Sequence, residues 1–379
     1  MPKLQILVKF ITLKRRKNRV NTKGEGERTD FDFLDDFFEA VCNKNSTFAI
    51  SKLNYLQMKR ILYLVCMAII FIACHKNNDE VPQPDPNKPT PDKPIPDNPK
   101  PDKPTPNNPT NAYLYGITID DSWEETGVTV QQIVSAIKAM PVKPTVRIVM
   151  SKGTAIANYK PLFSAVHQVA YVMATPADSE DMKGYKTVDS YVKRFQDSYK
   201  ELSAYTDFWE VGNEINGEGW MGDDPQFIAD KAYGAYKFIR SKNAKTVLVS
   251  YYFKPGDQKV TMEDWLKRYI PEDMKKELDY VLVSYYEDDN GNYQPNWQEV
   301  FNNLESIFPS VKLGIGECGN NDYKKYSVQS KVERAKHYYS MPKYVKNYVG
   351  GYFWWYWVQD CVPHQNSEVF KAINNSLVK

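Results

Sequence analysis

The feature that most constrains the fold is a regular alternation of short apolar runs with longer amphipathic stretches after residue 112. The apolar runs are rich in β-branched and aromatic residues, which is typical of strands, and they lie at 113–119, 145–150, 169–174, 208–212, 246–251, 280–284, 311–316 and 351–357. Apolar residues at helical spacing fill the intervals at 130–140, 191–205, 227–239, 265–278, 297–308 and 332–344. The alternation indicates a parallel sheet covered by helices.

Eight such units favour a closed barrel over an open sheet. From residue 112 to residue 379 the chain has 268 residues, close to the roughly 250 of a (β/α)8 TIM barrel. An open doubly wound sheet is the alternative, but no glycine-rich phosphate loop follows the first predicted strand. We therefore predict an α/β fold in which 112–379 forms a (β/α)8 TIM barrel.

Charge and residue counts exclude several classes of function. The 49 Lys and Arg balance 47 Asp and Glu, so no charge excess points to nucleic acid. Only 4 His are present, and His167, His337 and His364 lack the spacing of zinc ligands. We expect no metal and no organic cofactor. Cys318 and Cys361 follow neighbouring predicted strands, so the sequence allows either a disulfide between them or two free thiols.

A secretion signal is expected inside the N-terminal third. Met58 opens a basic pair followed by a 12-residue apolar run and then Ala-Cys; the run is shorter than the roughly 20 residues of a membrane span. The end of this segment resembles the lipobox of bacterial lipoproteins, which implies that 58–73 is the signal peptide and Cys74 the lipid-anchored residue. We expect 1–57 to be an upstream over-extension of the reading frame. A buried helix, or a true N-terminal domain before a membrane anchor, is the alternative.

Residues 74–111 are expected to be a stalk. Twelve of the 28 residues from Pro82 to Pro109 are proline, which excludes helix and sheet and favours extended backbone. A proline-rich recognition tract is the alternative. The polar run after Cys74 resembles the acidic export tags of surface lipoproteins, which implies a lipid-anchored protein of the bacterial outer membrane exposed at the cell surface. The periplasmic face stays open.

Candidate site residues follow the predicted strands at their C-terminal ends, where TIM barrels carry their chemistry. Two of them, Glu214 and Glu317, are carboxylates after apolar strands. An unpaired buried carboxylate is costly, so a carboxylate in such a place indicates a task. Two carboxylates across one cleft can cleave a glycosidic bond, because one donates a proton while the other attacks or positions water.

These two glutamates resemble the catalytic pair of glycoside hydrolase clan A, the retaining TIM-barrel glycosidases that include families 5 and 53. Asn213-Glu214 ends the fourth predicted strand and Glu317 ends the seventh. The resemblance implies that Glu214 is the general acid/base and Glu317 the nucleophile. It also implies that Asn213 holds the 2-hydroxyl of the sugar at the point of cleavage.

Three further motifs extend the resemblance and imply roles for neighbouring residues. Thr-Val-Arg-Ile is similar to the family 5 pattern in which the arginine, here Arg147, orients the nucleophile. Ser-Tyr-Tyr after the sixth strand resembles family 53, which implies that Tyr286 donates a hydrogen bond to Glu317. The final run, GGYFWWYW, resembles the strand whose tryptophan forms the floor of the sugar site, which implies Trp355, with Trp357 as the second choice.

The chain departs from the family 5 pattern at three places. Ile215 follows Glu214, where many members have proline, and Ser284 stands in place of a histidine. No histidine follows the third strand, where the chain has Thr175, Asp178 and Asp181 instead. Asp120 either binds substrate hydroxyls or caps the following helix. The carboxylates could instead be structural, each paired with a basic residue inside the barrel.

We predict a monomeric glycoside hydrolase that cleaves β-linked poly- or oligosaccharides by double displacement with retention. A non-catalytic surface glycan-binding lipoprotein on the same barrel is the alternative, and a stalked adhesin is a third possibility.

Overall fold

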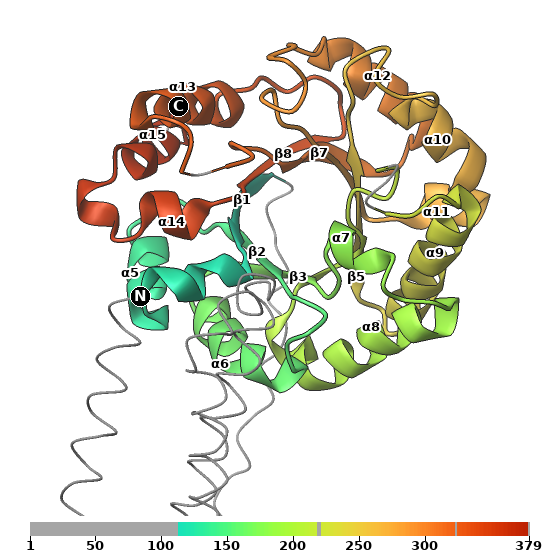
Figure 1. Ribbon diagram of the computed structural model, residues 1–379, viewed down its shortest axis with the longest axis horizontal. Coiled ribbons are helices and arrows are strands. Elements are labelled where there is room, and N and C mark those ends of the chain that lie inside the picture. Colours follow the sequence, from blue (N-terminus) through green and yellow to red (C-terminus); the bar gives the residue numbers. More distant parts are fainter. Residues whose placement is uncertain (1–112, 218–220, 323, 378–379) are drawn as a thin grey trace, which may run out of the picture. The chain divides into compact units, whose positions relative to one another are not determined.

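The computed structural model describes residues 113–217, 221–322 and 324–377 (Figure 1). The predictions for 1–57, for the signal peptide 58–73, for the stalk 74–111 and for the lipid anchor at Cys74 lie outside these residues. Within them, no helix combines the length and the apolar character needed to cross a bilayer.

The described residues form a closed barrel of parallel strands, each hydrogen-bonded to the next strand along the chain and the last to the first (Figure 1). The strands are β1 (Leu114–Ile119), β2 (Thr145–Val149), β3 (Tyr171–Thr175), β4 (Phe208–Gly212), β5 (Lys245–Tyr251), β6 (Tyr280–Ser284), β7 (Lys312–Glu317) and β8 (Tyr348–Trp354). The predicted (β/α)8 TIM barrel is confirmed.

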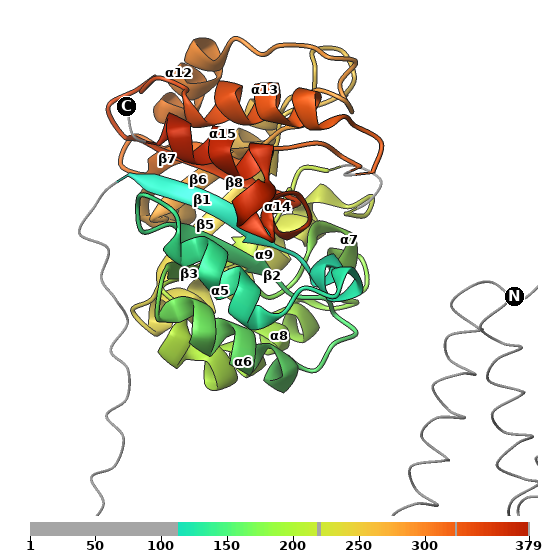
Figure 2. The same cartoon turned by 90° about the vertical axis from the view of Figure 1, so that its left-hand side faces the viewer.

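Helices follow the strands and cover the outside of the barrel (Figure 2). They are η1 (Asp121–Thr126), α5 (Val130–Lys138), α6 (Ile156–His167), α7 (Ser179–Met182), α8 (Val188–Leu202), η2 (Ser203–Tyr205), α9 (Pro225–Ser241), α10 (Met262–Tyr269), α11 (Glu272–Glu277), α12 (Trp297–Ile307), α13 (Val328–Tyr339), α14 (Trp357–Cys361), η3 (His364–Asn366) and α15 (Glu368–Ser376).

Two of the differences from the sequence-based expectation have a cause in the backbone. The single helix expected at 265–278 is two helices, α10 and α11, because Pro271 removes a backbone donor and holds Ile270 in extended backbone. The last strand, β8, ends at Trp354 rather than at Trp357. Gly351 explains part of this shift: it has a φ of 105°, and a Cβ there would lie 2.0 Å from the carbonyl oxygen of Ile315. The irregular backbone thus moves the following aromatic residues into a turn and a helix.

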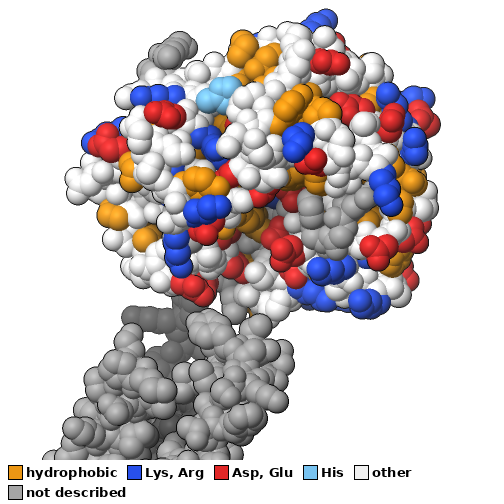
Figure 3. Space-filling view, turned by 45° about the horizontal axis from the view of Figure 1, so that its top comes forward, with side chains coloured by type: hydrophobic (Ala, Val, Ile, Leu, Met, Phe, Trp, Pro, Cys, Tyr) orange, Lys and Arg blue, Asp and Glu red, His pale blue; other side chains and the backbone are white. Residues whose placement is uncertain are grey.

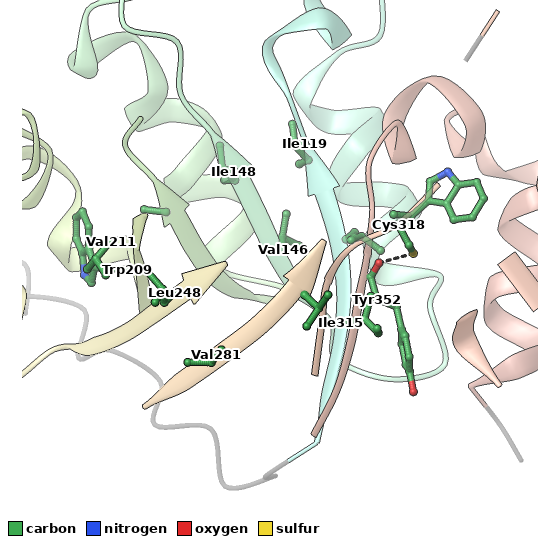
Figure 4. Packing of buried hydrophobic residues seen from close by; sticks show 14 of the residues in the cluster. Ile119, Val146, Ile148, Trp209, Val211, Leu248, Val281, Ile315, Cys318 and Tyr352 are labelled. Atoms are coloured by element: carbon green, nitrogen blue, oxygen red, sulfur yellow. Dashed lines mark hydrogen bonds between the residues drawn. The ribbon is translucent and has the colours of Figure 1, made fainter. Parts of the chain in front are cut away.

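Strand alternation divides the core into two parts. An outer cluster between strands and helices includes Val146 of β2, Leu248 of β5 and Ile315 of β7 (Figure 4). An inner cluster fills the barrel from its N-terminal end: Leu114, Met173, Phe208, Val247, Val249, Tyr280, Leu282, Val349 and Phe353. Because apolar side chains close this end, the barrel presents its polar interior at the C-terminal end.

The two cysteines of the described residues are free thiols. Cys318 and Cys361 are both buried, and the Cys318 thiol donates a hydrogen bond to the carbonyl oxygen of Tyr352 at 2.5 Å (Figure 4). Of the two possibilities that the sequence leaves open, the structure has the free thiols.

Candidate active site

A cleft of about 750 Å³ lies among the segments that follow the C-terminal ends of the strands. Figure 3 shows one face of the domain, on which Asp and Glu side chains surround a hollow. The cleft is lined by residues that follow β3 (Asp178, Ser179, Glu180), β4 (Asn213, Glu214), β5 (Tyr251, Phe253, Asp257, Gln258), β6 (Tyr286, Asp289, Asn290), β7 (Glu317, Asn321) and β8 (Trp355, Tyr356). Both predicted catalytic glutamates therefore lie in one cleft.

Glu317, the last residue of β7, is held by two donors. Arg147 Nη1 lies 2.6 Å from Glu317 Oε2, and the Tyr286 hydroxyl donates to Glu317 Oε1 at 2.5 Å. Burial raises the pKa of Glu317 to about 7, whereas Arg147 and the hydrogen bond from Tyr286 act to lower this pKa. The contacts expected of Arg147 and Tyr286 are thus present.

Arg147 is in turn fixed by Glu210, a residue that the sequence analysis missed. Glu210 and Arg147 form a bidentate ion pair. Glu210 Oε2 lies 2.6 Å from Arg147 Nε, and Glu210 Oε1 lies 2.9 Å from Arg147 Nη2. Thr175 donates to Glu210 Oε2 at 2.6 Å. The signal was present in β4: Trp209 and Val211 face the outer cluster, so the charged residue between them must face the barrel interior.

Glu214 has a different environment from that of Glu317. No described cation pairs with it, and its Oε1 accepts a hydrogen bond from the Ser284 hydroxyl at 2.5 Å. Burial, together with the nearby charge of Glu317, raises the pKa of Glu214 well above its ordinary value. Its backbone has a φ of 47°, the left-handed region that non-glycine residues rarely adopt. Such strain at a buried polar residue is typical of functional sites.

The two environments separate the protonation states of the two carboxyl groups. Direct contact with Arg147 and Tyr286 favours the ionised form of Glu317, while Glu214 makes no ion pair with a described residue and burial raises its pKa well above the ordinary value. One protonated and one ionisable carboxyl group in a single cleft can act as a general acid and as a nucleophile or general base.

Trp355 lines the cleft, and the guanidinium of Arg147 lies 5.5 Å from its ring centroid. Trp357, the second choice for the sugar floor, is wrong. Because β8 ends at Trp354, Trp357 is the first residue of α14; its ring is fully buried and lies 6.3 Å from that of Phe370. Trp354 is also buried, and its Nε1 donates to Asp360 Oδ2 at 2.9 Å.

Asp120 caps a helix and is not among the residues that line the cleft, so the capping use is confirmed and substrate binding by Asp120 stays a prediction. Its Oδ2 accepts from the backbone N–H of Ser122 at 3.2 Å, at the start of η1. Its Oδ1 accepts from Gln359 Nε2 at 3.0 Å, which ties the β1 turn to α14. Aspartate is a common N-cap residue, and here each of its carboxylate oxygens accepts a hydrogen bond from within the protein.

Several cleft residues lie in loops, where no apolar period indicates which side chains face the cleft. Asp178 accepts a hydrogen bond from Asn213 Nδ2 at 2.9 Å. Asn290 is buried and donates to the Tyr251 hydroxyl at 3.0 Å. Phe253 and Tyr356 add aromatic surface on segments after β5 and β8. In the described part of the chain, no group of three or more His, Cys, Asp and Glu is arranged to hold a metal ion.

Comparisons with known proteins show what fold the chain shares. No protein-family model matches the sequence, and no curated protein matches it. PbGH5A, a glycoside hydrolase family 5 enzyme from Prevotella bryantii solved with a xyloglucan tetradecasaccharide, is similar in structure: the TM-score is 0.50 at 12% identity, over 70% of this chain and 96% of that chain.

Two more structures are similar at lower scores. The Prevotella bryantii endo-β-mannanase/endo-β-glucanase PbGH26A-GH5A has a TM-score of 0.49 at 13% identity, over 71% of this chain and 51% of that one. ScGas2 has a TM-score of 0.47 at 12% identity, over 70% of this chain and 65% of that one. The chain thus spans less than two thirds of the length of both proteins. The match to PbGH5A confirms the expected fold, a (β/α)8 TIM barrel.

Replacing Glu210 by glutamine should destabilise the protein by about 3 kcal/mol, because the change breaks a buried charge pair. The melting temperature of the Glu210→Gln variant, measured by calorimetry, checks this. Glu333→Gln, on the exposed face of α13, is the matched control and should melt like the wild type. Equal melting temperatures for the two variants would contradict the role given to the Arg147–Glu210 pair.

Proposed function

We propose that the chain is a glycoside hydrolase that cleaves β-linked poly- or oligosaccharides with retention of configuration. The observation that carries this proposal is the pair of buried carboxyl groups, Glu214 and Glu317, which lie in one cleft and have different partners: Arg147 and Tyr286 contact Glu317, and Ser284 contacts Glu214. The barrel shared with PbGH5A supports it, since a family 5 glycosidase uses that scaffold. The rim of aromatic and amide side chains around the pair also suits a sugar ligand.

In the first step, ionised Glu317 attacks the anomeric carbon and forms a covalent bond to the sugar. Glu214 gives its proton to the departing glycosidic oxygen, so the leaving sugar departs as a neutral alcohol. In the second step Glu214, now ionised, takes a proton from water, and the resulting hydroxide displaces Glu317 from the anomeric carbon. Two inversions give net retention.

The surrounding residues prepare this reaction. Arg147 and Tyr286 hold Glu317 in place and favour its ionised form. Burial keeps the pKa of Tyr286 well above its ordinary value, so its hydroxyl stays a donor. Asn213, adjacent to Glu214, contacts the sugar at the point of cleavage, and Trp355 offers a face on which the sugar ring stacks.

Product analysis of the full chain with a panel of β-linked polysaccharides tests the proposal. Mass spectrometry should detect oligosaccharides, and proton NMR of the first product should show the β-anomer. Glu214→Gln should lower kcat by about 10²- to 10⁴-fold because it removes the proton donor, and Glu317→Gln should lower it at least as much.

Glu333→Gln is the control and should keep wild-type activity. Binding of a polysaccharide without products would replace the hydrolase by a non-catalytic glycan-binding protein. Unchanged products from Glu317→Gln would assign the nucleophile to another residue.

The pH dependence of kcat/KM should reflect both carboxyl groups. Activity should fall as the pH drops through about 7, where Glu317 takes up a proton, and fall again at high pH as Glu214 loses its own. Tyr286→Phe removes a hydrogen bond that lowers the pKa of Glu317, so the acidic limb should move to higher pH.

The control is Tyr285→Phe, because the Tyr285 hydroxyl donates to the carbonyl oxygen of Tyr293 and not to Glu317. It should leave the acidic limb in place. A limb that moves equally in both variants would contradict the assignment of this limb to Glu317.

The N-terminal sequence supports a proposed site of action: the outer surface of a bacterial outer membrane, to which a lipid on Cys74 anchors the protein. The lipobox-like Ala-Cys and the proline-rich stretch after it carry this proposal. Cells fed labelled palmitate should label the wild-type chain and not Cys74→Ala, which should leave the membrane fraction. Cys66→Ala is the control and should incorporate as much labelled palmitate as the wild type. If Cys74→Ala still incorporates the label, the proposed anchor at Cys74 is refuted.

A further inference from the structure

Asp178 is a carboxylate in the cleft that the two-carboxylate reaction does not use. Its Oδ1 accepts two hydrogen bonds, from the backbone N–H of Ser179 at 2.7 Å and from Asn213 Nδ2 at 2.9 Å. Among the described residues, none donates to its Oδ2. One oxygen of a charged side chain in the cleft is therefore available to a ligand.

Asn213 adds a second acceptor next to Asp178. Its side chain lines the cleft and the residue is 2% exposed. Because Nδ2 is directed to Asp178, Oδ1 is left with no partner in the described part of the chain. An unpaired buried acceptor costs free energy, and a ligand donor would recover that cost. Asn213 precedes Glu214 in the chain, so this acceptor pair lies beside the reacting centre.

Around Asp178 and Asn213 the cleft has an excess of acidic side chains. Burial raises the pKa of Asp178, with Arg147 as the cation that opposes the shift. Arg147 is already engaged, because its three nitrogens bind Glu210 and Glu317. The described lining of the cleft contains no Lys, Arg or His, and its acidic members are Asp178, Glu180, Glu214, Asp257, Asp289 and Glu317.

A ligand group for this place needs donors and, preferably, positive charge. A hydroxyl supplies one donor and no charge. An acetamido group also supplies one donor, and its carbonyl and methyl groups add bulk beside two acceptors. An ammonium group supplies three donors and a charge, and a hydrogen bond to a charged group is stronger than a neutral one. An anionic sugar would meet carboxylates with no free cation to pair with.

We propose that the substrate is a glycan with free amino groups, and that an ammonium substituent of the sugar binds between Asp178 and Asn213. This inference rests on the proposed function of the same cleft and names its substrate class. The ammonium supplies a cation beside Asp178, since Arg147 is engaged by Glu210 and Glu317, and its hydrogens satisfy Asp178 Oδ2 and Asn213 Oδ1.

Three series of oligosaccharides of equal length test this binding directly. Cello-, chitin and chitosan oligosaccharides share one backbone and linkage and carry a hydroxyl, an acetamido or an amino group at the same ring position. Calorimetry on the full-chain Glu317→Gln variant, at a mildly acidic pH, measures affinity without turnover. Chitosan oligosaccharides should bind about tenfold to hundredfold more tightly than either neutral series. Equal affinities, or tighter binding of a neutral series, would overturn the proposal.

Asp178→Asn, made in the same Glu317→Gln background, locates the effect. It removes the charge and keeps the size of the side chain, so the preference for the amino series should fall to less than about threefold while the affinity for neutral oligosaccharides changes little. The matched variant is Asp257→Asn, also in the cleft, whose carboxylate already has Lys254 at 3.3 Å; it should keep the preference. An equal loss in both variants would show a diffuse charge effect and overturn the site.

The two proposals fail in different ways. Wild-type chain that releases products from neutral glycans, with no preference for amino sugars, contradicts the amino-sugar site and leaves the hydrolase intact. Wild-type chain that binds chitosan oligosaccharides in an Asp178-dependent manner, but releases no products from any glycan, contradicts the hydrolase and leaves the amino-sugar site intact.

Discussion

The buried guanidinium of Arg147 is the interaction on which the site depends. It lies on β2, binds Glu210 of β4 through two nitrogens and binds Glu317 of β7 through the third. Three strands that are distant in the sequence are thereby joined inside one barrel. A fully buried cation is tolerated there because each of its nitrogens has a charged partner. The same bonds fix the position of the carboxyl group that would attack the sugar.

This arrangement requires a barrel with two chemically different ends. The inner cluster closes the N-terminal end with apolar side chains such as Phe208 and Leu282. Dehydration above that cluster is what raises the pKa of both Glu214 and Glu317. Only Glu317 is in direct contact with Arg147 and Tyr286, so the two carboxyl groups ionise at different pH. In the proposed reaction, the difference between the proton donor and the nucleophile thus comes from their neighbours, since both residues are glutamates.

The sequence-based errors near the candidate site come from irregular backbone after the strands, whereas the helix expected at 265–278 is divided by Pro271. Continuous alternation through GGYFWWYW predicts a strand that runs to Trp357, but close approach of β7 at Gly351 and the turn after Trp354 end it early. Trp355 therefore lines the cleft and Trp357 is packed in the core. The sequence allowed Asp120 either to bind substrate or to cap the following helix, and its hydrogen bonds with Ser122 and Gln359 show the capping role. Asp178 was noted after the third strand without a role, because loops carry no period that would show which of their side chains enter the cleft.

The sequence by itself determined a parallel sheet covered by helices, because the period of its apolar residues requires both faces of the strands to be buried, and eight such units favoured the closed barrel. It also placed Glu214 and Glu317 at strand ends, where a barrel gathers its polar groups. The tertiary structure alone decided which partners these residues have: Arg147 with Glu210, Ser284 with Glu214, Asn213 with Asp178. Periodicity fixes the face on which a side chain lies, whereas a hydrogen bond depends on the distance between side chains, which the packing of separate strands and loops sets.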